Sequence, residues 1–198
     1  MQLLSEPDEL FGIPPFTHSG ILPPYLGDSP GDMPDLMSPY VTCIAHIVNR
    51  FGFSEKRREI LKGLIKYRAH LRELGISEGF QWIDGSFVES KAVPKDVDIV
   101  TFVDWEMPEL NADERVKLEE SMHILVNPLS IDNFLCDARF VNFFYSKRDK
   151  LVSVSRYWFG LFSHRRETFE WKGLLQIPLD QCADSVALEA LNAGGQDE

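Results

Sequence analysis

From residue 39 onward, hydrophobic positions recur with helical spacing in four stretches, and short apolar runs rich in β-branched and aromatic residues lie between them. The clearest helical stripe begins behind Ser54, a favourable N-cap, and ends at Gly75. The predicted helices cover residues 39–51, 54–74, 111–125 and 150–162, and the predicted strands cover 80–83, 97–103, 134–145 and 174–179. This order predicts an α/β chain of alternating helices and strands.

The two ends of the chain differ from this periodic part. Eight of the twelve prolines lie within residues 1–39. Proline favours extended backbone, so residues 1–36 are predicted to form an extended arm that packs along the domain or a partner, with disorder as the alternative. We expect one domain over residues 37–180, followed by a flexible acidic tail over residues 181–198.

Composition narrows the class of protein. A chain of 198 residues with 44% hydrophobic content suits one globular domain. The net charge of −11 argues against general DNA or RNA binding, although it leaves room for a local basic cleft. The three cysteines lack zinc spacing, no apolar run reaches about 20 residues, and the start of the sequence does not resemble a signal peptide. We therefore expect a cytoplasmic protein that does not enter a membrane.

The stretch from Phe80 to Phe102 carries the candidate chemistry. Residues two apart on a strand share a face, so Asp96 and Asp98 are expected to project together and to hold a divalent cation. Gly85 permits turn geometry, and Ser86 at the start of a following helix offers a hydroxyl and N–H groups to an anion. The alternative is a plain hairpin turn followed by the solvated start of a core strand.

Gly85-Ser86, nine intervening residues and then Asp96-Val97-Asp98 with an apolar strand resemble the signature of the polymerase-beta-type nucleotidyltransferase superfamily. The wider string from Trp82 to Val88 is similar to an uncharacterised bacterial branch of its minimal single-domain members. The resemblance covers about 23 residues. It implies a small mixed β-sheet with flanking helices, Mg²⁺ or Mn²⁺ as cofactor, and ATP or another nucleoside triphosphate as substrate.

The resemblance also implies a third metal-binding carboxylate on a later strand. Asp137 fits this position best, and Asp132 is the second choice. By strand alternation Arg139 faces the same way as Asp137 and is expected to hold that carboxylate or a phosphate. Minimal members often carry a basic residue and a second glycine shortly after Gly-Ser, whereas this sequence has Phe87, Val88, Glu89 and Ser90 there. A carboxylate at Glu89 would repel a triphosphate unless it points away. Lys91 or Lys95 would have to supply the missing positive charge.

Two functions from different classes are expected. The first follows from the resemblance, and the second also from the acidic composition, the proline-rich arm and the basic helix 54–74, which suit contact with another protein. The first is Mg²⁺-dependent transfer of a nucleoside monophosphate, with AMP as the expected group, to a hydroxyl on protein or RNA. Asp96, Asp98 and Asp137 would be catalytic metal ligands, and Gly85, Ser86, Lys95 and Arg139 would bind the nucleotide. The second is a nucleotidyltransferase-like binding or regulatory subunit, with weak or no catalysis, in a bacterial toxin–antitoxin or phage-defence (antiviral) system with an operon-encoded protein partner.

Two basic stretches remain open. Helix 54–74 carries seven of the twenty Lys and Arg residues, which form either a solvated helix face or a docking face for RNA or an acidic partner. The segment His164-Arg165-Arg166, together with Lys172, forms either a surface loop or a group of cations near a triphosphate.

Overall fold

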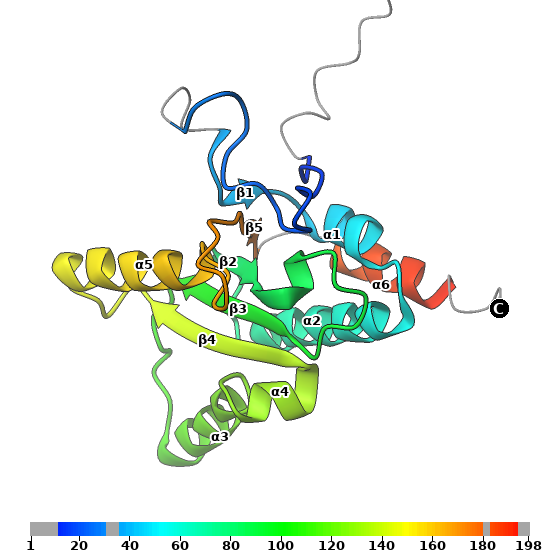
Figure 1. Cartoon of the computed structure of the whole chain (residues 1–198). Coiled ribbons are helices and arrows are strands. Elements are labelled where there is room, and N and C mark those ends of the chain that lie inside the picture. The colour runs from blue at the N-terminus through cyan, green and yellow to red at the C-terminus, as the bar shows by residue number, and fades with distance from the viewer. Residues whose placement is uncertain (1–11, 31–35, 180–182, 194–198) are drawn as a thin grey trace, which may run out of the picture.

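The computed structural model describes residues 12–30, 36–179 and 183–193. Within these residues the chain forms one five-stranded mixed sheet with the order β1-β5-β2-β3-β4 and six α-helices around it (Figure 1). The strands are β1 (Tyr40–Val41), β2 (Gly79–Asp84), β3 (Val97–Val103), β4 (Cys136–Asn142) and β5 (Leu175–Pro178). β2 runs antiparallel to β3 and β5, whereas β4 is parallel to β3 and β1 to β5. The predicted α/β class and small mixed sheet are confirmed.

The helices are α1 (Ile44–Phe51), α2 (Glu55–Glu73), α3 (Ala112–His123), α4 (Leu129–Phe134), α5 (Arg148–Phe162) and α6 (Asp184–Ala193). α2 begins where its cap predicts, because the Ser54 hydroxyl accepts a hydrogen bond from the Arg57 backbone N–H. α3 opens with a reciprocal capping box between Asn111 and Glu114. The helix predicted over 111–125 therefore exists, and it ends at His123.

The sheet separates two hydrophobic cores. Ile83, Ile99 and their neighbours face the larger core, which α1, α2 and α6 cover. The alternate positions Trp82, Val100 and Phe102 face a smaller aromatic core beneath α5. Since strand residues two apart share a face, Asp84 lies on the same face as Trp82, and Asp98 on the same face as Val100. The aspartates therefore sit on the α5 side of the sheet.

The helix predicted over 39–51 is shorter than expected. Tyr40 and Val41 form β1, because the N–H groups of Tyr40 and Thr42 donate to the carbonyls of Leu174 and Gln176 beside β5. This pairing joins segments far apart in the sequence, so helical spacing alone cannot reveal it. α4, a six-residue helix between the predicted helix and strand, was not predicted either.

Both ends of the described chain contribute to the packing. In the predicted arm, Ile21 and Leu22 are buried, and the Phe16 ring packs edge-on against Phe51. The predicted flexible tail is wrong for α6, whose Ala187 and Leu191 are buried in the larger core. The parts of these predictions on residues 1–11, 31–35, 181–182 and 194–198 lie outside the described residues. No helix in the described ranges is long and apolar enough to cross a membrane.

Candidate functional site

A row of three aspartates crosses the sheet at one end of the α5 face. Asp84 on β2 pairs in register with Asp98 on β3, and Asp98 pairs with Asp137 on β4. Asp96 lies just before β3. All four line a cavity of about 290 Å³. The other residues lining this cavity are Gly85, Ser86, Glu89, Leu161, Phe162, His164, Arg165, Arg166 and Lys172.

The structure thus brings together five of the seven residues predicted for the site, namely Gly85, Ser86, Asp96, Asp98 and Asp137. Arg139 lines a second hollow of about 110 Å³ that shares Asp98 and Asp137 with the first. Lys95 is exposed and lines neither hollow. The second-choice carboxylate, Asp132, is exposed on α4 and also lies outside both. Asp137 is therefore the carboxylate that accompanies Asp98.

The negative charges in this row disfavour one another. Burial, followed by the neighbouring carboxylates of Asp96 and Asp137, raises the pKa of Asp98 from 3.8 to about 6. Burial and Asp137 also raise the pKa of Asp96. Arg166 is the nearest opposite charge to Asp98, and its Nη2 lies 3.9 Å from Asp98 Oδ1. A bound cation would relieve this repulsion.

Asp137 is held by two neighbours. Asn127 Nδ2 donates to Asp137 Oδ1 over 2.7 Å, and Arg139 forms an ion pair with the same oxygen. This confirms the expected pairing of Arg139 with Asp137. Among the described residues, no group of three or more His, Cys, Asp and Glu side chains could hold a metal ion as it stands. Carboxylate oxygens are nevertheless the donors that Mg²⁺ prefers, so a cation here would have to compete with Arg139 for Asp137.

Gly85 occupies a position that no other residue fits without strain. Its φ is +78°, and a Cβ placed on it would lie 1.8 Å from Asp98 Oδ2. The segment that follows is a single 3₁₀ turn, Gly85–Val88, so the short helix expected after Ser86 is one turn long. This turn lies beside Asp98, and the seating of phosphates by Gly85 and Ser86 stays a prediction.

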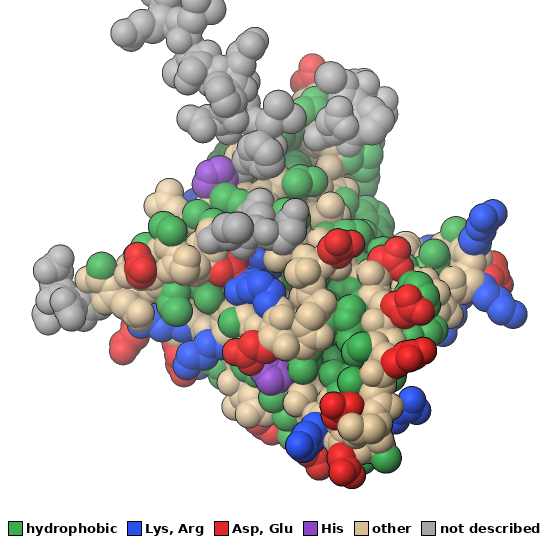
Figure 2. Space-filling view, turned by 180° about the vertical axis from the view of Figure 1, so that it is seen from behind, with side chains coloured by type: hydrophobic (Ala, Val, Ile, Leu, Met, Phe, Trp, Pro, Cys, Tyr) green, Lys and Arg blue, Asp and Glu red, His purple; other side chains and the backbone are tan. Residues whose placement is uncertain are grey.

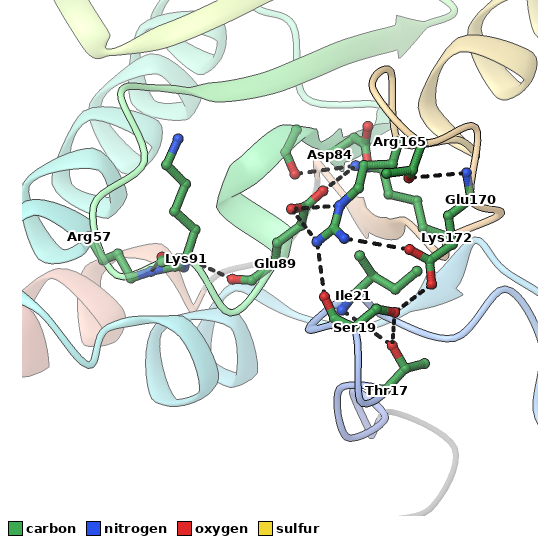
Figure 3. A network of polar contacts seen from close by, with 12 residues as sticks. Thr17, Ser19, Ile21, Arg57, Asp84, Glu89, Lys91, Arg165, Glu170 and Lys172 are labelled. Atoms are coloured by element: carbon green, nitrogen blue, oxygen red, sulfur yellow. Dashed lines mark hydrogen bonds and ion pairs between the residues drawn. The ribbon is translucent and has the colours of Figure 1, made fainter.

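Glu89 is not an unpaired charge in the cavity. Its Oε2 accepts from Arg165 Nη2 over 2.9 Å, and its Oε1 lies 3.5 Å from Lys172 Nζ (Figure 3). Arg165 also donates to the Ser19 carbonyl and pairs with Glu170. The charge opposing Glu89 therefore comes from Arg165 and Lys172. These partners lie more than 70 residues away along the chain, so local sequence could not identify them.

Asp84 and Lys172 form a buried pair that the sequence did not indicate. Lys172 Nζ lies 2.9 Å from Asp84 Oδ1, although outside hydrogen-bond geometry, and it donates to the Gly85 carbonyl over 3.3 Å. Both side chains are almost fully buried. Burial raises the pKa of Asp84 to about 7 in spite of the opposing effect of Lys172. Lys172 thus ties β2, the Gly85 turn and Glu89 together beneath the cavity.

The segment from His164 to Lys172 is part of the site. Its side chains divide into two groups, because Arg165 and Lys172 are tied to acidic partners whereas the Arg166 side chain is 74% exposed. Arg166 lines both hollows. The segment therefore lies at the cavity, and its contact with a triphosphate stays a prediction.

The basic residues of α2 were expected to form either a solvated face or a docking face, and two of them do neither. Arg57 and Arg68 are fully buried. The Arg57 guanidinium donates to the carbonyls of Phe87, Glu89 and Lys91, which fixes the segment following the Gly85 turn (Figure 3). Arg68 pairs with Asp184 of α6. These two residues are therefore internal supports and belong to no solvated or docking face.

Comparison with known proteins adds a family without an assigned activity. A family model described as "Family of unknown function (DUF6932)" matches residues 14–178, which include every residue lining the two hollows. A search of curated proteins found no match to this chain.

Proposed function

Since the chain belongs to this family of unknown function (DUF6932), we propose from the site itself that it transfers a nucleoside monophosphate from a nucleoside triphosphate to a hydroxyl group. ATP is the expected donor. The observation that carries the proposal is that Asp98 and Asp137 on neighbouring strands, and Asp96 just before β3, line one cavity with the Gly85-Ser86 turn and basic side chains. The spacing of these residues resembles polymerase-beta-type nucleotidyltransferases, as set out above.

In this proposal Asp96, Asp98 and Asp137 hold Mg²⁺ or Mn²⁺. When bound, the metal would offset the charge of the carboxylates and of the phosphates. Arg166 is the cation most available to the phosphates, because it is exposed and lies over Asp98. Ser86 lines the same cavity and offers its hydroxyl to a phosphate oxygen.

The reaction is an in-line exchange at the α-phosphorus. The acceptor oxygen bonds to this phosphorus while the bond to the oxygen bridging the β-phosphorus breaks, and pyrophosphate leaves with that electron pair. The acceptor proton passes to Asp137. Both hydrogen-bonding partners of Asp137 use Oδ1, so Oδ2 is the oxygen left to receive the proton.

One observation favours the alternative of a binding or regulatory subunit. Arg165 and Lys172 are occupied by Glu89, Glu170 and Asp84, which leaves fewer cations for a triphosphate than the cavity lining alone suggests. In that case the chain would bind a partner protein and show no transfer. Nucleotide turnover therefore separates the two functions.

The test uses ATP labelled at the α-phosphate, Mn²⁺ or Mg²⁺, and candidate acceptors of protein and RNA. Asp98→Asn is expected to lower the transfer rate by at least about 100-fold, since it removes a central carboxylate while preserving side-chain shape. Asp132→Asn, a matched change on the exposed face of α4, is expected to leave the rate unchanged. Transfer by Asp98→Asn at the wild-type rate would falsify the assignment.

A further inference from the structure

Two segments leave the sheet side by side at one end of the molecule. β3 and β4 are parallel and finish in register, where Val103 pairs with Asn142. Residues 104–111 lead from β3 to α3, and a short connection leads from β4 to α5 (Figure 1). The Met107 N–H donates to the Tyr145 hydroxyl over 3.0 Å, which holds the two segments together beyond the sheet.

The helices that these segments lead to have few buried side chains. α3 has no buried residue, and the one buried residue of α5 is Phe162 at its C-terminal end. Val116 on α3 is 54% exposed, and Val152 and Tyr157 on α5 are 70% and 58% exposed. Helices in proteins owe most of their stability to the packing of an apolar face. Both helices therefore leave apolar side chains in solvent that a partner would cover.

The two segments carry opposite charges. Residues 104–120 contain seven Asp and Glu residues against two Lys and Arg, and residues 147–156 contain four Lys and Arg residues against Asp149. All these charged side chains are exposed, and none forms an ion pair with another described residue. In Figure 2, where the outer end of α5 lies at the right, Lys and Arg side chains project from that end, and Asp and Glu side chains gather between it and α3.

An aromatic centre lies between the acidic and the basic segment. Tyr145 accepts the hydrogen bond from Met107 of the acidic segment, and it lines a hollow of about 410 Å³ together with Lys150 of α5. The Phe144 ring packs edge-on against Tyr145, with 5.0 Å between the ring centroids. These two aromatic side chains are 48% and 62% exposed. The order across this end of the molecule is therefore acidic segment, aromatic centre and basic helix.

Such an order of charges is complementary to itself. A two-fold axis through the centre places the acidic segment of one copy against the basic helix of the other, and it repeats this contact on the opposite side. An apolar centre with a charged rim is also the usual anatomy of a protein interface. We propose that two copies of this chain associate through residues 104–120 and 144–157, which we call the end face. A second copy fits better than an unrelated partner, because both signs of charge are present on the end face and both are unpaired within the described chain.

The mass of the full chain in solution tests for this dimer. Sedimentation equilibrium is followed over a wide range of protein concentration, first at low salt. The mass of two chains is expected at high concentration, and it should fall toward the mass of one chain on dilution. Raising the salt should weaken the association, because exposed charge pairs are screened. A mass of one chain at every concentration and at low salt would overturn the inference.

Two charge-reversed variants locate the interface. Lys150→Glu with Arg156→Glu makes α5 acidic, and Glu106→Lys with Glu109→Lys makes the segment after β3 basic. Either variant alone places like charges opposite each other, and its dissociation constant is expected to rise at least about tenfold. An equal mixture of the two variants restores opposite charges at both contacts, so it should form a mixed dimer at the wild-type concentration.

The matched control changes the same number of charges elsewhere. Lys62→Glu with Lys66→Glu, on the outer side of α2, should dimerise like the wild type. A dimer that both reversed variants retain, or that the control weakens as much as they do, would show that the copies meet through another surface. Neither result bears on nucleotide transfer, because none of these six residues lines the cavity of the aspartates.

Discussion

At the residue scale, the site depends on close approaches that single side chains permit. Gly85 lets the turn after β2 pass directly over Asp98, and burial together with the neighbouring carboxylates raises the pKa of Asp98 to about 6. Sequence reasoning found both residues, because a Gly-Ser turn and an Asp-x-Asp strand have recognisable patterns. It did not find Lys172 or the neutralisation of Glu89, because these contacts join distant segments whose side chains have no local signature.

Gly85→Ala is expected to lower both stability and transfer. The positive φ costs an alanine about 1 kcal/mol, and the clash of its Cβ with Asp98 Oδ2 adds to this and displaces the carboxylate. Gly75→Ala is the matched control, because Gly75 has a φ of +76° and nothing within 4 Å of its Cβ position. Denaturant unfolding should show a larger loss of stability in Gly85→Ala than in Gly75→Ala, and transfer assays should show a loss of transfer in Gly85→Ala alone. Full transfer by Gly85→Ala would contradict the proposed contact.

The raised pKa of Asp98 also predicts how the stability of the protein depends on pH. Because folding raises its pKa from 3.8 to about 6, the carboxyl favours the folded state below about pH 4 and loses that contribution as the pH rises through 6. The shift corresponds to roughly 3 kcal/mol. Asp98→Asn should therefore match the wild type near pH 4 and be more stable above about pH 7. A stability difference between the two proteins that does not change with pH would show that folding does not raise the pKa of Asp98.

At the scale of elements, the accuracy of prediction follows the range of the interactions. The strand predicted over 97–103 is β3 to the residue, and α2 begins at its predicted cap, since apolar runs and caps are local signals. β1 depends on pairing with β5, and α6 depends on packing against α1 and α2, so neither follows from its own sequence. The acidic composition that suggested a flexible tail in fact includes Asp184, the partner of buried Arg68.

Asp184→Ala tests whether α6 is an integral element. The substitution leaves Arg68 buried without its carboxylate partner, which typically costs about 3–5 kcal/mol. Arg72 also loses an ion pair of 2.7 Å. Glu189→Ala, on the exposed side of the same helix, should change the free energy of unfolding by less than about 0.5 kcal/mol. Equal unfolding midpoints for the two variants would show that α6 contributes little to the fold.

At the scale of the whole molecule, one face of the sheet carries the stable core and the other carries the site. α1, α2 and α6 cover the first face, and Arg57 and Arg68 extend from α2 to brace the site segment and α6. On the second face, the end of α5 and the segment 164–172 close around the aspartates. Because the site is assembled from β2, β3 and β4 only in the folded state, a ligand bound here is expected to stabilise the domain.

Thermal unfolding with and without millimolar Mn²⁺ and ATP tests the central claim, that Asp96, Asp98 and Asp137 form one cation and nucleotide site. Binding to the folded state alone contributes about 2.7 kcal/mol at a hundredfold excess over Kd, which raises the Tm of a domain of this size by several degrees. The wild type should show this rise, Asp132→Asn should retain it, and Asp98→Asn and Asp137→Asn should lose it. An unchanged wild-type Tm, or an equal rise in Asp137→Asn, would contradict the account.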